Sequence, residues 1–196
     1  MTAVSAGQQG RAYSFSPNSI GGTGRTVSMA TEKDAERRAR QGSAELPADC
    51  HPDIRAIVTY WRAIHPDTGL PGRQHFDPLD IPKLLPRIRI LDVVGDPPRF
   101  KTRLLGTKIA EGTGFDYTGR YLDEVYPEFA SSAAAHGLNA VLRTGELHWR
   151  RGNPALVRGK ELMTIERVYL PFARDGRKID MILTCLLFGD CSGKMY

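Results

Sequence analysis

The sequence predicts an α+β fold in which an antiparallel sheet is covered by helices. Two apolar segments near the C-terminus, Glu161–Pro171 and Lys178–Phe188, flank an Asp175-Gly176 pair. Asp-Gly accepts the positive φ of a tight turn, so this stretch predicts a β-hairpin. The second segment is apolar on both faces, which indicates a central strand in a sheet covered on both sides.

A helix is predicted to open the folded region and to supply one of these covers. Pro52 suits a first helical turn, and apolar residues then recur at helical spacing. The stripe comprises Ile54, Ile57, Val58, Trp61 and Ile64. We expect it to lie on the outer face of the sheet, or alternatively on a partner chain as the interaction helix of a homodimer.

The middle of the chain predicts two more strands, a helical region and a third strand. Arg87–Val94 and Arg99–Leu105 are separated by a Gly-Asp-Pro-Pro turn. A glycine-rich helical stretch follows, with a helix over Ser131–Arg143, and Leu147–Arg151 is the next strand. Together with the hairpin, these segments make a five-stranded antiparallel sheet with an inserted helical segment, which is typical of the α+β class.

Composition divides the chain into one folded domain and two tails. Residues 1–49 are rich in small and polar residues, so we expect a disordered N-terminal tail, with Met29 as an alternative start to Met1. The domain is expected over residues 50–190 and a short C-terminal tail over 191–196. No apolar run approaches the ~20 residues of a membrane span, and no secretion signal is present, so we predict a cytoplasmic protein.

Metal binding and catalysis find little support in the sequence. The three cysteines have no paired spacing, and Cys185, in the middle of a strand, is expected to be a small core residue. The histidines do not have the spacing of metal ligands either. Asp123 and Glu124 are adjacent and therefore diverge, which is poor geometry for an acid/base pair. We therefore predict no metal site and no enzyme activity.

Several short segments, in order between His51 and Phe188, resemble one known family. They are Tyr60-Trp61-Arg62, Ile81–Val93, Pro97–Thr107, Thr118–Pro127 and Glu166–Gly176. These segments resemble PAS domains, most closely the stand-alone proteobacterial PAS family formerly catalogued as a domain of unknown function. The resemblance implies the strand order 2-1-5-4-3, with the last strand in the centre. It also implies a sensory, regulatory or scaffolding module.

A candidate ligand pocket is expected between the inner face of the sheet and the helical middle. Its predicted walls are Leu104, Phe115, Leu122, Leu138, Val141, Leu142, Trp149, Met163, Ile165 and Leu183. The same residues also suit a filled core, and apolar lining does not separate the two. His136 is expected to point away from the apolar face of its helix and His148 away from Trp149, which argues against haem. The sequence identifies no cofactor.

The functional hypothesis is a sensory or regulatory module that binds a signalling protein and is gated by a small apolar ligand. One alternative is a haem- or flavin-binding sensor or an enzyme that uses the pocket. A second is a nucleic-acid-associated regulator, although the net charge of +5 is modest and scattered. That alternative would use Lys101, Arg103, Arg150, Arg151, Arg158 and Lys160.

Overall fold

A five-stranded antiparallel sheet forms the centre of the protein in the computed structural model, which describes residues 45–153, 163–190 and 194–195. The strands are β1 (Ile88–Val94), β2 (Arg99–Leu105), β3 (His148–Gly152), β4 (Thr164–Phe172) and β5 (Met181–Gly189). Their order is β2-β1-β5-β4-β3, which confirms the predicted order and places the last strand in the centre.

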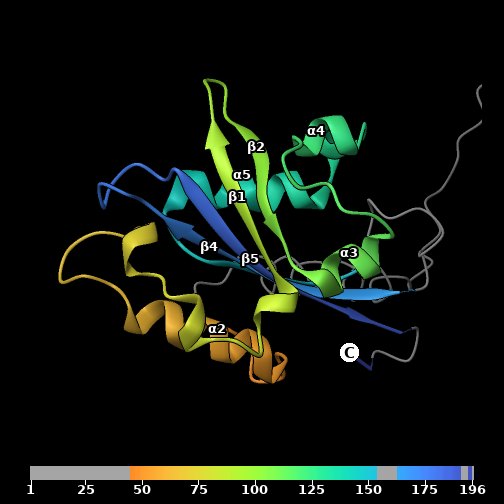
Figure 1. Cartoon of the computed structure of the whole chain (residues 1–196), viewed down its shortest axis with the longest axis horizontal. Coiled ribbons are helices and arrows are strands. Elements are labelled where there is room, and N and C mark those ends of the chain that lie inside the picture. Colours follow the sequence, from red (N-terminus) through yellow and green to blue (C-terminus); the bar gives the residue numbers. More distant parts are fainter. Residues whose placement is uncertain (1–44, 154–162, 191–193, 196) are drawn as a thin grey trace, which may run out of the picture.

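Helices cover both faces of this sheet (Figure 1). They are α2 (Pro52–Ala63), α3 (Thr107–Thr113), α4 (Leu122–Val125) and α5 (Ala133–Thr144), with short 3-10 turns at Arg73–His75, Pro78–Asp80, Leu85–Arg87 and Phe129–Ser131. Helix α2 lies on one face, which we call the outer face. The other three lie on the opposite, inner face (Figure 1). Among the described residues, no helix has the length and apolar character that a membrane crossing requires.

Strand β5 contributes side chains to both layers, as its apolar pattern predicts. Leu183 and Cys185 pack in the cluster beneath α2, whereas Ile182 and Phe188 pack in the clusters of the inner face. Burial raises the pKa of the Cys185 thiol to about 12. This cysteine is therefore a neutral core group, in agreement with the sequence.

Helix α2 packs its apolar stripe on its own sheet. Ile54, Ile57 and Val58 are at most 1% exposed, and the indole of Trp61 donates a 3.0 Å hydrogen bond to the carbonyl oxygen of Pro171. Ile64, just beyond the helix end, is half-buried. A homodimer through this stripe would therefore require α2 to leave the sheet.

The β4–β5 connection is longer than the tight turn expected from Asp175-Gly176. Phe172 pairs with Met181, so residues 173–180 form the loop. Gly176 has the expected positive φ of 75°. The Asp175 carboxylate accepts hydrogen bonds from the backbone amides of Arg177 and Lys178 at 2.9 and 2.8 Å. These amides therefore do not pair in the sheet, and β5 begins three residues later than predicted.

The N-terminal tail through residue 44, including Met29, lies outside the described residues. So do residues 154–162, with Arg158 and Lys160, and most of the predicted C-terminal tail.

Candidate ligand-binding site

A cavity of about 40 Å³ lies between the inner face of the sheet and the helical layer. Its polar lining comes mainly from three arginines and three tyrosines: Arg89, Arg150, Arg167, Tyr117, Tyr126 and Tyr169. Its apolar lining includes Ile165, Leu186 and Phe188. A cavity needs about 10–15 Å³ to hold one water molecule, so this one has room for a compact chemical group.

The register of the sheet brings the arginines together. Arg150 of β3 pairs directly with Arg167 of β4, so the two side chains share the inner face. Arg89 of β1 and Tyr169 of β4 both pair with Thr184 of the central strand. Arg89 therefore lies on the same face as the arginine pair, on the other side of the central strand β5.

Arg89 and Arg167 are only 6% and 7% exposed. The Arg89 guanidinium donates a 3.3 Å hydrogen bond to the Tyr117 hydroxyl, and the Arg167 guanidinium lies 5.5 Å from the centre of the Tyr169 ring. Neither arginine forms an ion pair within the described residues, and the Nε atom of each has no hydrogen-bond partner there. Burial, with a smaller effect from the Arg89 charge, lowers the pKa of Arg167.

The tyrosines supply aromatic walls and hydroxyl groups. The rings of Tyr117 and Tyr126 meet edge to face with their centres 5.8 Å apart. Burial, followed by the neighbouring Tyr117, raises the pKa of Tyr126, so this phenol is neutral at physiological pH. The Tyr169 hydroxyl is buried and has no hydrogen-bond partner among the described residues. The site therefore presents cations and neutral hydroxyl groups to whatever occupies it.

Of the ten pocket residues predicted from the sequence, Ile165 lines this cavity. Leu122, Leu138 and Val141 are fully buried in the core between sheet and helices, with Leu142 packed against that core. Met163 packs in the small cluster that contains Ile165. These five residues besides Ile165 lie in the expected layer and fill it rather than line the cavity.

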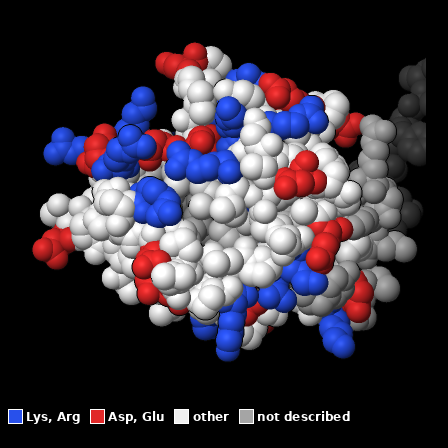
Figure 2. Space-filling model, viewed as in Figure 1, with Lys and Arg blue, Asp and Glu red and all other residues white. Residues whose placement is uncertain are grey.

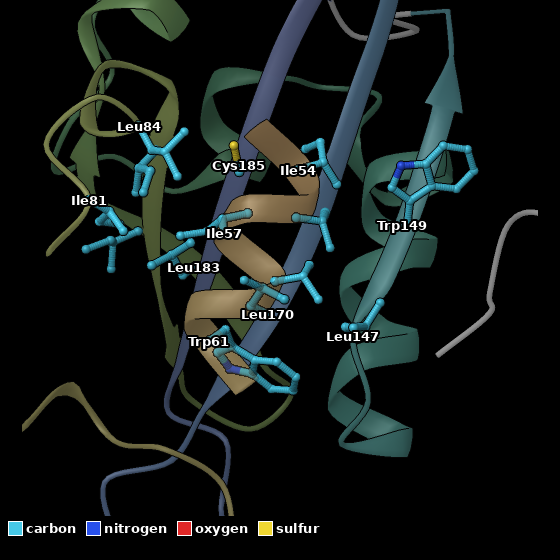
Figure 3. Close-up of a cluster of buried hydrophobic side chains, with 14 of the residues drawn as sticks. Ile54, Ile57, Trp61, Ile81, Leu84, Leu147, Trp149, Leu170, Leu183 and Cys185 are labelled. Carbon is cyan, nitrogen blue, oxygen red and sulfur yellow. The ribbon is translucent and has the colours of Figure 1, made fainter. Parts of the chain in front are cut away.

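Three predicted pocket residues, Leu104, Trp149 and Leu183, lie on the outer face instead. Trp149 and Leu183 pack in the cluster beneath α2 (Figure 3). His148, which precedes Trp149 in β3, therefore lies on the inner face, where its ring stacks on that of Tyr169 with their centres 6.0 Å apart. A register shift between Ile90 and Leu91 pairs Leu104 with Ile90, an outer-face residue.

Two other expectations concern single residues of the helical middle. Phe115, also predicted to be in the pocket, is 45% exposed. His136 is exposed, and its ring nitrogen lies 2.8 Å from the carbonyl oxygen of Ser132, as the helical periodicity predicts.

The described members of the basic set considered for nucleic-acid binding do not gather on one surface. Arg103 pairs with Asp92 and Arg151 with Glu166, whereas Arg150 lines the cavity. Figure 2 shows basic and acidic side chains interspersed on the visible face. This distribution does not resemble a phosphate-binding stripe.

An apolar groove of about 400 Å³ lies on the outer side of the sheet, beside β2. Its lining includes Phe76, Leu85, Ile90 and Leu104. Leu104 is 42% exposed, and Leu79, next to the groove residue Pro78, is 81% exposed. This groove is a second concave site, separate from the cavity on the inner face.

The role of the arginines is not evident from hydrophobic spacing. Arg167 lies in the interior of a strand whose sheet was already predicted to be covered on both sides. A charged residue there has to be buried on one face or the other. That combination, rather than the apolar positions, is the signal that could have located the cavity.

Comparison with known proteins assigns the chain to a family. The sequence profile of a family described as "PAS domain" matches residues 50–187. No curated protein matches the chain. One similar solved structure is a sensory box sensor histidine kinase from Vibrio cholerae, with 18% identity and a TM-score of 0.41, covering 57% of this chain and 90% of that one. Another is an RNA-binding Light-Oxygen-Voltage receptor, with 15% identity and a TM-score of 0.40, covering 75% of this chain and 37% of that one.

Proposed function

Because the chain belongs to the PAS domain family, we propose that it is a non-catalytic sensory module whose cavity responds to a small ligand and whose surface binds a signalling protein. The cavity between the sheet and the helical layer carries this proposal. Its walls come from β1, β3, β4 and β5 on one side and from α3 and α5 on the other. An occupant therefore contacts both layers at once.

The helical side of the cavity is suited to respond. Helix α3 spans only Thr107–Thr113, and a helix this short depends on packing for its stability. A ligand that changes the packing against α3 shifts the population of its conformations. Such a shift is a signal that a partner protein can read.

The apolar groove on the outer side is the proposed partner surface. A contiguous apolar patch with exposed leucines is typical of an interaction site. Pro86, Leu105 and Thr107 line the groove, and α3 begins at Thr107, so the groove adjoins a helix that also contributes to the cavity wall. We propose an apolar segment of a signalling protein as the occupant. The stripe of α2 is not proposed as the partner surface, because its residues Ile54, Ile57, Val58 and Trp61 are already buried.

Native mass spectrometry with an ultraviolet-visible spectrum tests the sensory role on freshly purified full chain. We expect a stoichiometric extra mass, and a visible band would identify a chromophore. Hydrogen exchange of the loaded and emptied forms is expected to differ at α3 and α5.

The matched variants are Ala134→Leu, which fills the cavity, and Ala140→Leu, a less buried position on the same helix. Only Ala134→Leu is expected to abolish the extra mass and the exchange difference. The proposed function would be contradicted if the wild-type chain carried no extra mass and if Ala134→Leu and Ala140→Leu showed the same hydrogen exchange at α3 and α5.

A further inference from the structure

The inner face of the sheet holds positive charge that the described residues do not balance. Arg89 and Arg167 are more than nine-tenths buried, and no carboxylate of the described residues pairs with either of them. Guanidinium groups remain protonated in proteins, so both are cations at physiological pH. Arg150, which has interactions of its own, lies directly opposite Arg167 across the strand pair.

This arrangement is costly for a protein that holds nothing in the cavity. Moving an isolated ion out of water costs several kcal/mol, and buried charges in proteins are therefore almost always paired. Like charges directly opposite on neighbouring strands repel each other. The tyrosine hydroxyl near Arg89 and the ring near Arg167 reduce this cost, but neutral groups do not cancel the charge.

The outer face of strands β3 and β4 shows how the chain itself balances a buried charge. The buried Glu166, next to Arg167 in β4, pairs with Arg151 at 2.8 Å and accepts a 2.9 Å hydrogen bond from the indole of Trp149. No such partner faces Arg167 within the described residues. An anion from outside this part of the chain would supply the partner that Arg167 lacks.

We propose that the cavity binds a compact oxyanion, a carboxylate or phosphate group, which accepts hydrogen bonds from Arg89 and Arg167. This inference rests on the proposed function, because it names the class of ligand that the sensory module detects. The planar guanidinium group binds both carboxylate and phosphate through paired hydrogen bonds. The cavity volume of about 40 Å³ suits a group of this size.

The cavity also sets what the anionic group is attached to. Ile165, Leu186 and Phe188 line its remaining wall, so the ligand has a small apolar part next to the charged one. The purely apolar ligand expected from the sequence does not satisfy the arginines. A small carboxylic acid or a phosphorylated small molecule does.

The test measures the thermal stability of the full chain after dialysis into a buffer without phosphate or carboxylates. Sodium phosphate and sodium succinate are added in turn, against sodium chloride at equal ionic strength and against neutral succinamide. A bound anion at about a hundredfold excess over its Kd raises the Tm by about 5 °C or more. Whichever of phosphate and succinate acts identifies the chemical source of the oxyanion.

The variants are Arg167→Met and Arg89→Met, with Arg177→Met as an exposed control in the β4–β5 loop. We expect each cavity variant to weaken anion binding by about 10- to 100-fold, the range for hydrogen bonds to charged groups. Without anion, Arg167→Met is expected to raise the Tm, because it removes an unpaired buried cation. If Arg167 had a purely structural role, its replacement by Met would instead lower the Tm.

No response of the wild-type chain to either anion, together with a native mass that carries no bound anion, would overturn the inference. So would equal responses in Arg167→Met and Arg177→Met. A neutral co-purifying ligand that the arginine variants still bind would overturn the oxyanion but leave the sensory role intact. Conversely, anion binding without any exchange difference at α3 and α5 would support the oxyanion and contradict the sensory role.

Discussion

Glu166 and Arg167 are neighbours in β4 and bury opposite charges on opposite faces of the sheet. The Glu166 carboxylate is fully buried and accepts a 2.9 Å hydrogen bond from the backbone amide of His51, in addition to its contacts with Trp149 and Arg151. It therefore connects β3 and the start of α2 to β4. Arg167 connects nothing within the described residues. We therefore assign a structural role to the charge of Glu166 and the proposed ligand-binding role to the charge of Arg167.

Replacing the structural charge should destabilise the protein strongly. We expect Glu166→Ala to lower the free energy of unfolding by about 3 kcal/mol, because it leaves the Trp149 indole without its acceptor and Arg151 without its buried partner. Urea unfolding measures the loss. Asp49→Ala is the control, since Asp49 also pairs with Arg151 but its side chain is 66% exposed, and it should cost less than about 1 kcal/mol. Equal losses in the two variants would show that the burial of Glu166 is unimportant.

At the scale of single elements, the sequence predicts where strands and helices lie better than which face they present. Strand β2 has the predicted bounds, and the stripe of α2 packs as expected, because hydrophobic spacing defines both. Both faces of the sheet are buried, so alternation in the short β3 does not show which cover Trp149 contacts. The register shift beside Leu104 depends on pairing between strands, which local sequence does not encode.

The position of the cavity could not be predicted from the sequence for a related reason. Apolar residues do not indicate its walls, because a well-packed protein fills its interior with such residues. The charged residues that line it look like surface residues when only their neighbours in the sequence are considered. Their burial follows from the topology that places β4 between β5 and β3.

Helix α3 lies close to the sheet because of Gly112. A Cβ atom at this position would clash with the Phe188 ring, which also lines the cavity. We expect Gly112→Ala to lower the free energy of unfolding by about 1–3 kcal/mol, the usual cost of overpacking, although alanine favours helix by about 1 kcal/mol.

Thermal unfolding of Gly112→Ala and Gly114→Ala compares the two effects. Gly114 ends α3 with a φ of 90° and open space around a Cβ atom, so its replacement introduces backbone strain alone, costing about 1–2 kcal/mol. Gly112→Ala should in addition weaken ligand binding, because the displaced Phe188 ring reduces the cavity. Wild-type stability and binding in Gly112→Ala would mean that the helix moves away from the ring without cost.

At the scale of the whole molecule, one strand joins two cores. The cluster beneath α2 and the clusters of the inner face are separated by the sheet, and β5 contributes buried side chains to all of them. No layer can lose its packing without disturbing this central strand. A change in packing on the outer face should therefore alter the packing on the cavity side, which is the coupling that a sensory module needs.

Ile57→Ala tests this coupling. Ile57 is fully buried beneath α2, and its truncation should lower the free energy of unfolding by about 3 kcal/mol through the lost burial and the remaining cavity. Both tryptophans, Trp61 and Trp149, lie in the outer core, so fluorescence reports that layer, whereas hydrogen exchange of α5 reports the inner one. Because β5 is shared, we expect the two probes to give the same urea midpoint in the wild-type chain and the same lowered midpoint in Ile57→Ala. If α5 stays protected from exchange after the tryptophan fluorescence has changed, the two layers unfold separately. A ligand in the cavity would then have no effect on the outer face through the sheet.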